Sequence, residues 1–169
     1  MSDFIELSPE KFNESPFKLV GQDWMLVTAA KAGAVNTMTA AWGGLGVMWT
    51  KNVSFVVIRP QRYTKEFIDG SDYFSLSFLD GSYKKQLSYL GTASGRDEDK
   101  ISKSELTVAY DNGVPYFTQA GKVMICKKLY AQPYQREFFI ATELDSKFYP
   151  DSDHHTMYIS EIVKLMVKE

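Results

Sequence analysis

Apolar and polar side chains alternate along much of this sequence with a period of two residues. Tyr73–Phe78 alternates aromatic or aliphatic residues with serine, and Thr37–Trp42 follows the same period. Because successive side chains of a strand point to opposite faces, this pattern predicts half-buried strands. Further strands are predicted from apolar, β-branched or aromatic runs, at residues 24–30, 53–58, 106–110, 122–130, 138–142 and 156–163.

Helices are predicted to be few and short. Ser8 followed by Pro9 is a helix-start signal, so a short helix is expected immediately after it. Further helical turns are expected at residues 65–68 with Thr64 as the cap, at 82–90 ending at Gly91, and at 99–104. Since predicted strands mostly follow strands, the sequence predicts a β-rich α+β fold whose antiparallel sheet forms a barrel or a sandwich.

Composition narrows the class of protein. The 169 residues suit one domain, expected to span 1–169, because no linker-like stretch divides them. A net charge of −2 excludes the basic footprint of a nucleic-acid-binding protein. The aromatic share of 14% favours a sheet or a site for flat ligands. The lone Cys126 cannot form an internal disulfide, and the N-terminus lacks a signal-peptide pattern, so we expect a cytoplasmic protein with no membrane span.

Several common functional patterns are incomplete in this sequence. Gly44 and Gly46 begin a dinucleotide-binding motif, but Trp49 stands at its third glycine position. His154 and His155 are adjacent, so in a strand they would point to opposite faces and could not easily chelate one ion. With no other histidine and one cysteine, no metal site is predicted. The pair is expected to provide one exposed and one half-buried imidazole.

Three polar segments are candidate binding elements. Asn36–Trp42 offers an amide, hydroxyls and an indole beside a glycine-rich turn, where the backbone can approach a ligand closely. Arg59 and Arg62 precede a helix start at Thr64, an arrangement that favours a phosphate. On chemistry alone, an ordinary helix start with solvated arginines accounts for these residues as well. Ser94–Lys100 is a charged turn that by itself is typical of a solvated loop.

In this order and at these spacings, the segments resemble the flavin reductase-like family with the FMN-binding split barrel, particularly its flavoredoxin-type branch. The matching pattern is Asn36-Thr37-Met38-Thr39 with Trp42, then Arg59-Pro60 with Arg62-Tyr63-Thr64, then Ser94-Gly95-Arg96-Asp97 with Asp99-Lys100. The closing segment His155–Ile162 is similar to that family's last strand. The resemblance covers the chain from about Trp24 to Val163.

The resemblance implies a fold, an assembly and a set of site residues. The fold would be a six-stranded antiparallel Greek-key split β-barrel with a few short helices, assembled as a homodimer with FMN bound near the subunit interface. The residues implied to line the isoalloxazine ring are Asn36, Met38, Thr39 and Trp42. Those implied around the phosphate are Arg59, Arg62, Tyr63 and Thr64. Ser77 is implied beside the flavin, Lys100 at the phosphate or ring edge, and His155 on the substrate side.

The function that the resemblance implies is that of an FMN-containing oxidoreductase. It would take electrons from NADH, NADPH or a protein donor and pass them to free flavin, another protein or a small acceptor. The hydride chemistry belongs to the flavin, so no protein acid, base or nucleophile is expected. The alternatives are a non-catalytic FMN-binding electron-transfer module without its own nicotinamide site, and a barrel that holds a different ligand such as haem.

Overall fold

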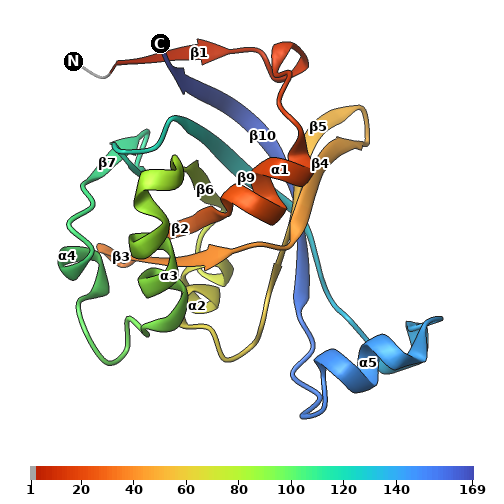
Figure 1. The fold of residues 1–169 in the computed structure, drawn as a ribbon. Helices are drawn as coiled ribbons and strands as arrows, with labels where there is room; N and C mark the ends of the chain where they lie inside the picture. Colours follow the sequence, from red (N-terminus) through yellow and green to blue (C-terminus); the bar gives the residue numbers. More distant parts are fainter. Residues whose placement is uncertain (1–2) are drawn as a thin grey trace.

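An antiparallel sheet forms most of the structure, a computed structural model that describes residues 3–169 (Figure 1). Met1 and Ser2 lie outside the described residues. They belong to the predicted domain 1–169 and to the N-terminus that is predicted to lack a signal peptide. The strands of the main sheet are β1 (Phe4–Leu7), β2 (Met25–Lys31), β3 (Ala34–Ala40), β4 (Gly43–Met48), β5 (Lys51–Ile58), β6 (Tyr73–Phe78), β9 (Lys122–Pro133) and β10 (Thr156–Lys168). A separate hairpin consists of β7 (Val108–Asp111) and β8 (Val114–Phe117).

The order of the strands confirms the predicted fold class. It runs β3-β2-β6-β9-β10-β5-β4, with β1 paired to β10, and neighbouring strands are antiparallel. The main sheet has eight strands rather than the expected six, within the same β-rich, split-barrel class. The long central strands β9 and β10 connect the two halves of the sheet.

Helices are short and lie around the sheet. They are α1 (Pro16–Lys18), α2 (Tyr63–Asp69), α3 (Lys84–Thr92), α4 (Lys100–Lys103) and α5 (Thr142–Phe148), with a π-helical turn at Leu19–Asp23 and 3-10 turns at Pro9–Lys11, Gly81–Tyr83 and Arg136–Phe138. The helical turns expected after Ser8 and near 65–68, 82–90 and 99–104 are confirmed in place. No helix within residues 3–169 is long and apolar enough to cross a membrane.

Two helix ends differ from the predictions. Thr64 does not cap α2, because Arg62 occupies the N-cap position and Thr64 lies in the first turn. The Thr64 hydroxyl instead accepts a hydrogen bond from the Asn36 side chain at 2.9 Å. α3 continues through Gly91 to Thr92 instead of ending at the glycine. For Thr64 the difference comes from a contact with β3, which local sequence signals do not contain.

The serines of β6 correct the prediction of a half-buried strand. Phe74 and Leu76 of β6 face one apolar cluster of the core, as their spacing predicts. On the other face, the Ser75 hydroxyl donates to the Pro115 carbonyl at 2.6 Å, and the Phe117 N–H donates to Ser77 at 3.3 Å. Both serines are fully buried, because β8 packs over this face of the sheet.

The chain between β9 and β10 leaves the sheet as a projecting segment, residues 134–155, which we call the arm (Figure 1). The strand predicted at 138–142 is wrong, because this segment pairs with no strand and contains the end of a 3-10 turn and the start of α5. Its apolar side chains therefore have no sheet to pack against. Phe138 is 69% exposed, and Ile140 is fully exposed.

The strands β1, β4 and β8 were absent from the predictions. In β4 the glycine-rich sequence is typical of a turn, yet it pairs with β5 along its whole length. Gly43 has a φ of +139°, and a Cβ at this position would lie 2.2 Å from the Phe55 carbonyl oxygen. Glycine is therefore required for β4 to begin beside β5.

Candidate functional site

Two cavities lie along β3 and the chain that follows it. The first, which we call the cation cavity, has a volume of about 170 Å³ and is lined by Asn36, Gln61, Arg62, Tyr63, Thr64, Thr92, Ala93, Ser94 and Lys100. The second, which we call the aromatic cavity, has a volume of about 250 Å³ and is lined by Met38, Thr39, Ala40, Ala41, Trp42, Val57, Arg59 and His155. Thr39 of the aromatic cavity is held against α3, because its hydroxyl donates to the Leu87 carbonyl.

Two cationic side chains of the cation cavity are held by backbone carbonyls at the end of α3. Arg62 Nη1 donates to the Gly91 carbonyl at 2.7 Å. Lys100 Nζ donates to the Leu90 and Ala93 carbonyls at 3.0 and 2.9 Å. Arg62 Nη2 is buried and has no hydrogen-bond partner among residues 3–169. An ammonium group carries three donors, so Lys100 also has one donor left for a ligand.

The charge of the cation cavity is unbalanced. Among the described residues that line it, none is acidic. Burial, together with the positive charge of Arg62, lowers the pKa of Lys100 to about 8. Burial also lowers the pKa of Arg62. Both shifts disfavour the charged forms, so an anion that bonds to the free donors would stabilise them.

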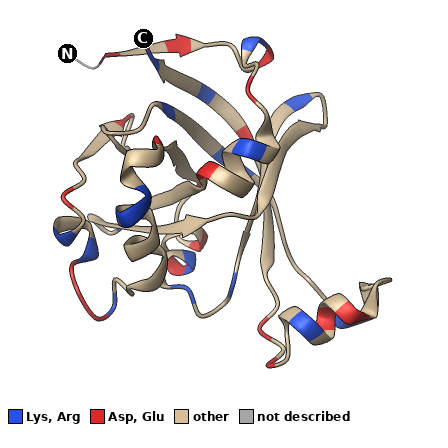
Figure 2. Ribbon diagram, in the orientation of Figure 1, with Lys and Arg blue, Asp and Glu red and all other residues tan. Residues whose placement is uncertain are grey.

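Acidic residues lie near the cation cavity but bond elsewhere. Figure 2 shows acidic residues on the loop before α4. Asp97, Glu98 and Asp99 of this loop line a wider hollow of about 340 Å³, which shares Asn36 and Lys100 with the cation cavity. The Glu98 carboxylate pairs with Lys103, and the Asp99 carboxylate caps α4. Neither carboxylate bonds to Lys100, so the cation cavity keeps its excess of positive charge.

The turn Ser94–Lys100 is fitted closely against β3 and α2. A Cβ on Gly95 would lie 2.2 Å from Asn36 Oδ1, so only glycine allows this approach. The Arg96 guanidinium lies over the Tyr63 ring at 4.6 Å from its centroid. The Asn36 amide in turn donates to Thr64. A segment that reads as a solvated loop by itself therefore forms one wall of the cation cavity.

The aromatic cavity has apolar walls and one partly exposed indole. Trp42 is 45% exposed, and its ring centroid lies 5.3 Å from that of His155 and 5.3 Å from that of Phe148 of the arm. Met38 and Val57 are buried beside it. Residues that are distant in sequence thus meet here, because the end of the arm returns to β10 next to β3 and β5.

Arg59 belongs to the aromatic cavity and not to the cation cavity. Its guanidinium pairs with the Asp153 carboxylate and donates to the Phe148 carbonyl at 2.9 Å. It also lies over the Tyr149 ring, 5.1 Å from the centroid. These contacts fasten the arm to the end of β5 and pair the charge of Arg59 with a carboxylate. The aromatic cavity is therefore close to neutral.

The two adjacent histidines have different partners. Nδ1 of His155 lies 2.7 Å from the Tyr149 hydroxyl, whereas Nε2 of His154 lies 2.6 Å from an Asp145 oxygen. Burial and the charge of Arg59 lower the pKa of His155 to about 4, so its ring is neutral at pH 7. The expectation of one exposed imidazole is wrong, because both rings are enclosed by the arm. Residues 3–169 contain no group of three or more potential ligands that could hold a metal ion.

The structure divides the predicted site residues between the two cavities. Those brought to the cation cavity are Asn36, Arg62, Tyr63, Thr64 and Lys100. Those brought to the aromatic cavity are Met38, Thr39, Trp42, Arg59 and His155. Ser77 lines neither, because it is buried under β8. Sequence reasoning missed Phe148, Tyr149 and Asp153, for which no local motif gives a signal.

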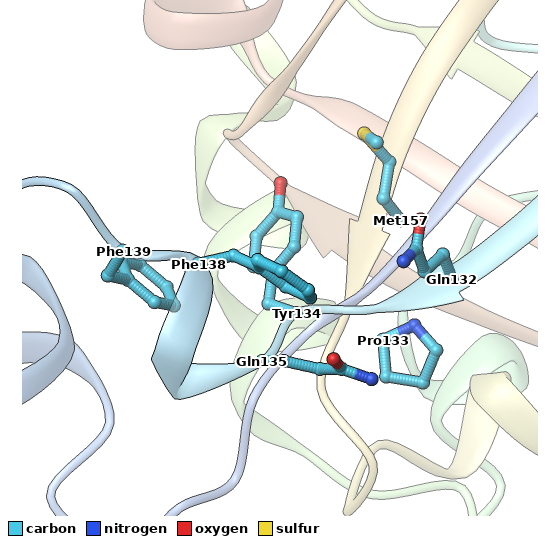
Figure 3. A pocket seen from close by; sticks show the side chains of 7 residues that line it. All are labelled: Gln132, Pro133, Tyr134, Gln135, Phe138, Phe139 and Met157. Atoms are coloured by element: carbon cyan, nitrogen blue, oxygen red, sulfur yellow. The ribbon is translucent and has the colours of Figure 1, made fainter.

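A third hollow, of about 520 Å³, lies at the base of the arm (Figure 3). Figure 3 shows Tyr134 and Phe138 of the arm on one side of it and Met157 of β10 on the other. It contains none of the predicted site residues, and its lining is mostly apolar. We call it the arm groove.

Comparisons with known proteins identify the same architecture elsewhere. The sequence matches the model of the flavin reductase like domain over residues 17–169. No curated protein matches it. The fold is similar to that of an FMN-binding domain of a flavin reductases-like enzyme from Shewanella baltica OS155, with a TM-score of 0.72 at 18% identity over 98% of this chain and 77% of that one.

Two further solved structures have similar folds. The flavoredoxin of Desulfovibrio vulgaris (Miyazaki F) gives a TM-score of 0.69 at 21% identity, over 98% of this chain and 78% of that one. An NADH:FAD oxidoreductase of Streptomyces globisporus C-1027 gives 0.63 at 14% identity, over 86% and 74%. At these identities the structural similarities show the fold alone.

Proposed function

Since the chain belongs to the flavin reductase-like family, we propose that it binds FMN and acts as an oxidoreductase. It would pass electrons from a reduced nicotinamide or a protein donor, through FMN, to a flavin or another acceptor. The observation that carries the proposal is the buried Arg62 Nη2, which has no partner among residues 3–169 and belongs to a cavity without an acidic lining residue. Family membership supports the oxidoreductase class, and the donor, the acceptor and FMN itself are parts of the proposal.

The residues of the cation cavity suit the phosphate of FMN. A phosphate monoester carries close to two negative charges and several strong acceptor oxygens. Arg62 and Lys100 would supply charged donors, and Thr64 a hydroxyl, with Asn36 holding Thr64 in place. This pairing would remove the mutual repulsion of the two cations.

The residues of the aromatic cavity suit a flat, mostly apolar ring. Met38, Thr39 and Trp42 would line the isoalloxazine. FMN, when bound, supplies the hydride and electron transfer. The chain would position the ring, exclude water with Trp42 and Val57, and offer the His155 imidazole at one edge. Arg59 would keep this wall in place through its contacts with the arm.

A second copy of the chain is the proposed partner of the arm. Phe138, Ile140 and Leu144 are exposed apolar side chains, and the arm groove lies beside them. Covering such a surface with a matching surface is favourable and typical of homodimers. Ile140→Glu should shift a dimer towards monomer in light scattering coupled to size exclusion, whereas the control Glu143→Gln on α5 should not. An unchanged mass for Ile140→Glu would place the interface elsewhere.

A titration of the apoprotein with FMN, followed by anaerobic addition of NADH or NADPH, tests the function. We expect saturable binding with a perturbed flavin spectrum, and bleaching of the bound flavin by a nucleotide. Absence of FMN binding would contradict the proposed cofactor. Bound flavin that stays oxidised with both nucleotides but accepts electrons from a reduced redox protein would identify an electron-transfer module instead.

A further inference from the structure

The two ring nitrogens of His155 have different surroundings. Nδ1 lies 2.7 Å from the Tyr149 hydroxyl. Among residues 3–169, none hydrogen-bonds to Nε2, although the imidazole lines the aromatic cavity. The ring nitrogen without a protein partner is therefore the one that a ligand in this cavity can reach.

The direction of the Tyr149–His155 bond follows from burial. Tyr149 is 4% exposed, and its hydroxyl has no hydrogen-bond partner within the described chain other than His155. If Nδ1–H donated to the hydroxyl oxygen, the hydroxyl hydrogen would be buried without an acceptor, which is unfavourable. The hydroxyl therefore donates to Nδ1, and the proton of the neutral imidazole is on Nε2.

We propose that Tyr149 is a positioning residue that holds His155 in the Nε2–H tautomer, so that the aromatic cavity accepts a flat, uncharged ring whose carbonyl oxygen bonds to Nε2–H. This deepens the proposed function, because the ring would belong to the flavin itself or to the electron acceptor beside it. The shared chemistry is a carbonyl oxygen on a planar ring.

The cavity selects against charged ligands. The Arg59 guanidinium is paired with the Asp153 carboxylate, and Met38 and Val57 form apolar walls. Because burial lowers the pKa of His155 to about 4, the ring donates as a neutral group and offers an anion no compensating charge. The volume of about 250 Å³ exceeds the roughly 150 Å³ of a cavity that holds benzene, so a single substituted ring, or one end of a fused ring system, fits.

The tautomer can be measured without any flavin. In the apoprotein labelled with ¹⁵N-histidine, long-range ¹H–¹⁵N spectra at pH 7 should show His155 as the Nε2–H tautomer. In Tyr149→Phe, the Nδ1–H form should become populated, because Nδ1 has lost its donor. His154 is the internal control for the tautomer, since its bond to Asp145 should keep its own tautomer unchanged although its ring stacks on that of residue 149. A wild-type ring in the Nδ1–H form, or a Tyr149→Phe spectrum identical to wild type, would overturn the proposal.

Ligand probes test the class of ring. Acetophenone should shift the His155 Nε2–H signal of the apoprotein, whereas ethylbenzene and benzoate should not. Tyr149→Phe and His155→Asn should weaken acetophenone binding about 3- to 10-fold, the value of one neutral hydrogen bond. His155→Gln, which can place an amide donor near the Nε2 position, should recover part of the loss. Equal binding of ethylbenzene, or no recovery by glutamine, would contradict the assigned hydrogen bond.

A last comparison distinguishes the two sources of the carbonyl. Lumiflavin, which has the flavin ring without the phosphate, should shift the Nε2–H signal of the apoprotein if the flavin supplies the carbonyl. If the electron acceptor supplies it, acetophenone should still shift that signal after the protein is loaded with FMN. If neither probe shifts it, the ligand class is wrong. These experiments fail independently of the proposed function, because the tautomer needs no cofactor.

Discussion

The cation cavity and the aromatic cavity are both lined by β3, yet the cationic side chains are unpaired in the first and paired in the second. In the cation cavity, Arg62 and Lys100 meet no acidic lining residue among those described and retain donors without a protein partner. In the aromatic cavity, Arg59 is paired with Asp153. Leaving a buried cation without a counter-charge is energetically unfavourable. The same chain avoids this cost for Arg59, which it pairs with a carboxylate. The contrast assigns the anionic part of a ligand to one cavity and its neutral ring to the other.

The largest effect should come from removing the unpaired cations. Arg62→Ala should weaken FMN binding by about 10- to 100-fold, because a hydrogen bond between charged groups contributes roughly 1.5–3 kcal/mol. Arg62→Ala combined with Lys100→Ala should weaken it further. Quenching of flavin fluorescence during titration of the apoprotein measures the dissociation constants.

Arg59→Gln is the matched control for this prediction. It removes the same type of charge from the aromatic cavity, where that charge already has partners in Asp153 and the Phe148 carbonyl. We expect a smaller loss of FMN affinity than for Arg62→Ala. Equal losses of FMN affinity in the two variants would mean that the phosphate lies between the cavities. Arg59 would then contact the phosphate, as the sequence resemblance implied.

A smaller effect is expected from crowding the wall of the cation cavity. In Gly95→Ala, the new Cβ would lie 2.2 Å from Asn36 Oδ1, so either the turn or the Asn36–Thr64 bond must move. FMN affinity should fall about 10-fold, and the unfolding free energy by roughly 1–3 kcal/mol. Gly81→Ala is the control, because nothing lies within 4 Å of its added Cβ. Unchanged FMN affinity in Gly95→Ala would mean that this wall of the cation cavity does not contact the ligand.

The sequence predicted the cation cavity better than the aromatic cavity, for a physical reason. Arg62, Tyr63 and Thr64 are contiguous at a helix start, and Lys100 follows a turn that a short motif describes. Such local signals can be recognised in the sequence without knowledge of the fold. Even so, the Thr64 cap was wrong, because Asn36 of β3 uses that hydroxyl.

The aromatic cavity depends on where the arm returns to the sheet. Phe138–Ile140 has the composition of a strand, and only the absence of a pairing partner in the fold makes it part of the arm. Tyr149 and Asp153 acquire their roles through His155 and Arg59, which are brought to them by β10 and β5. Likewise, Ser75 and Ser77 are buried only because β8 covers them. These outcomes require tertiary contacts that periodicity cannot supply.

Alkaline pH should affect the cation cavity selectively. The pKa of Lys100 is lowered to about 8 in the unliganded protein, so FMN affinity should fall as the pH rises above 8. In the apoprotein the sign for stability is opposite. Between pH 8 and 10.5 the unfolded chain keeps a proton that the folded protein has lost, so the unfolding free energy should rise with pH. Lys100→Met should flatten the pH profile of FMN affinity in titrations and the pH profile of stability in urea unfolding. If either profile persists in this variant, another titrating group is responsible for it.

Acidic pH should affect the aromatic cavity. The pKa of His155 is lowered from 6.5 to about 4, so between these values the unfolded chain binds a proton that the folded protein does not. The unfolding free energy should therefore decrease as the pH falls from 6.5 to 4. Urea unfolding of the apoprotein should show this slope, and His155→Gln should reduce it. If His155→Gln left the slope intact, the acid sensitivity would belong to other groups, such as the Asp145 and Asp153 carboxylates, whose pKa values are lowered by hydrogen bonds.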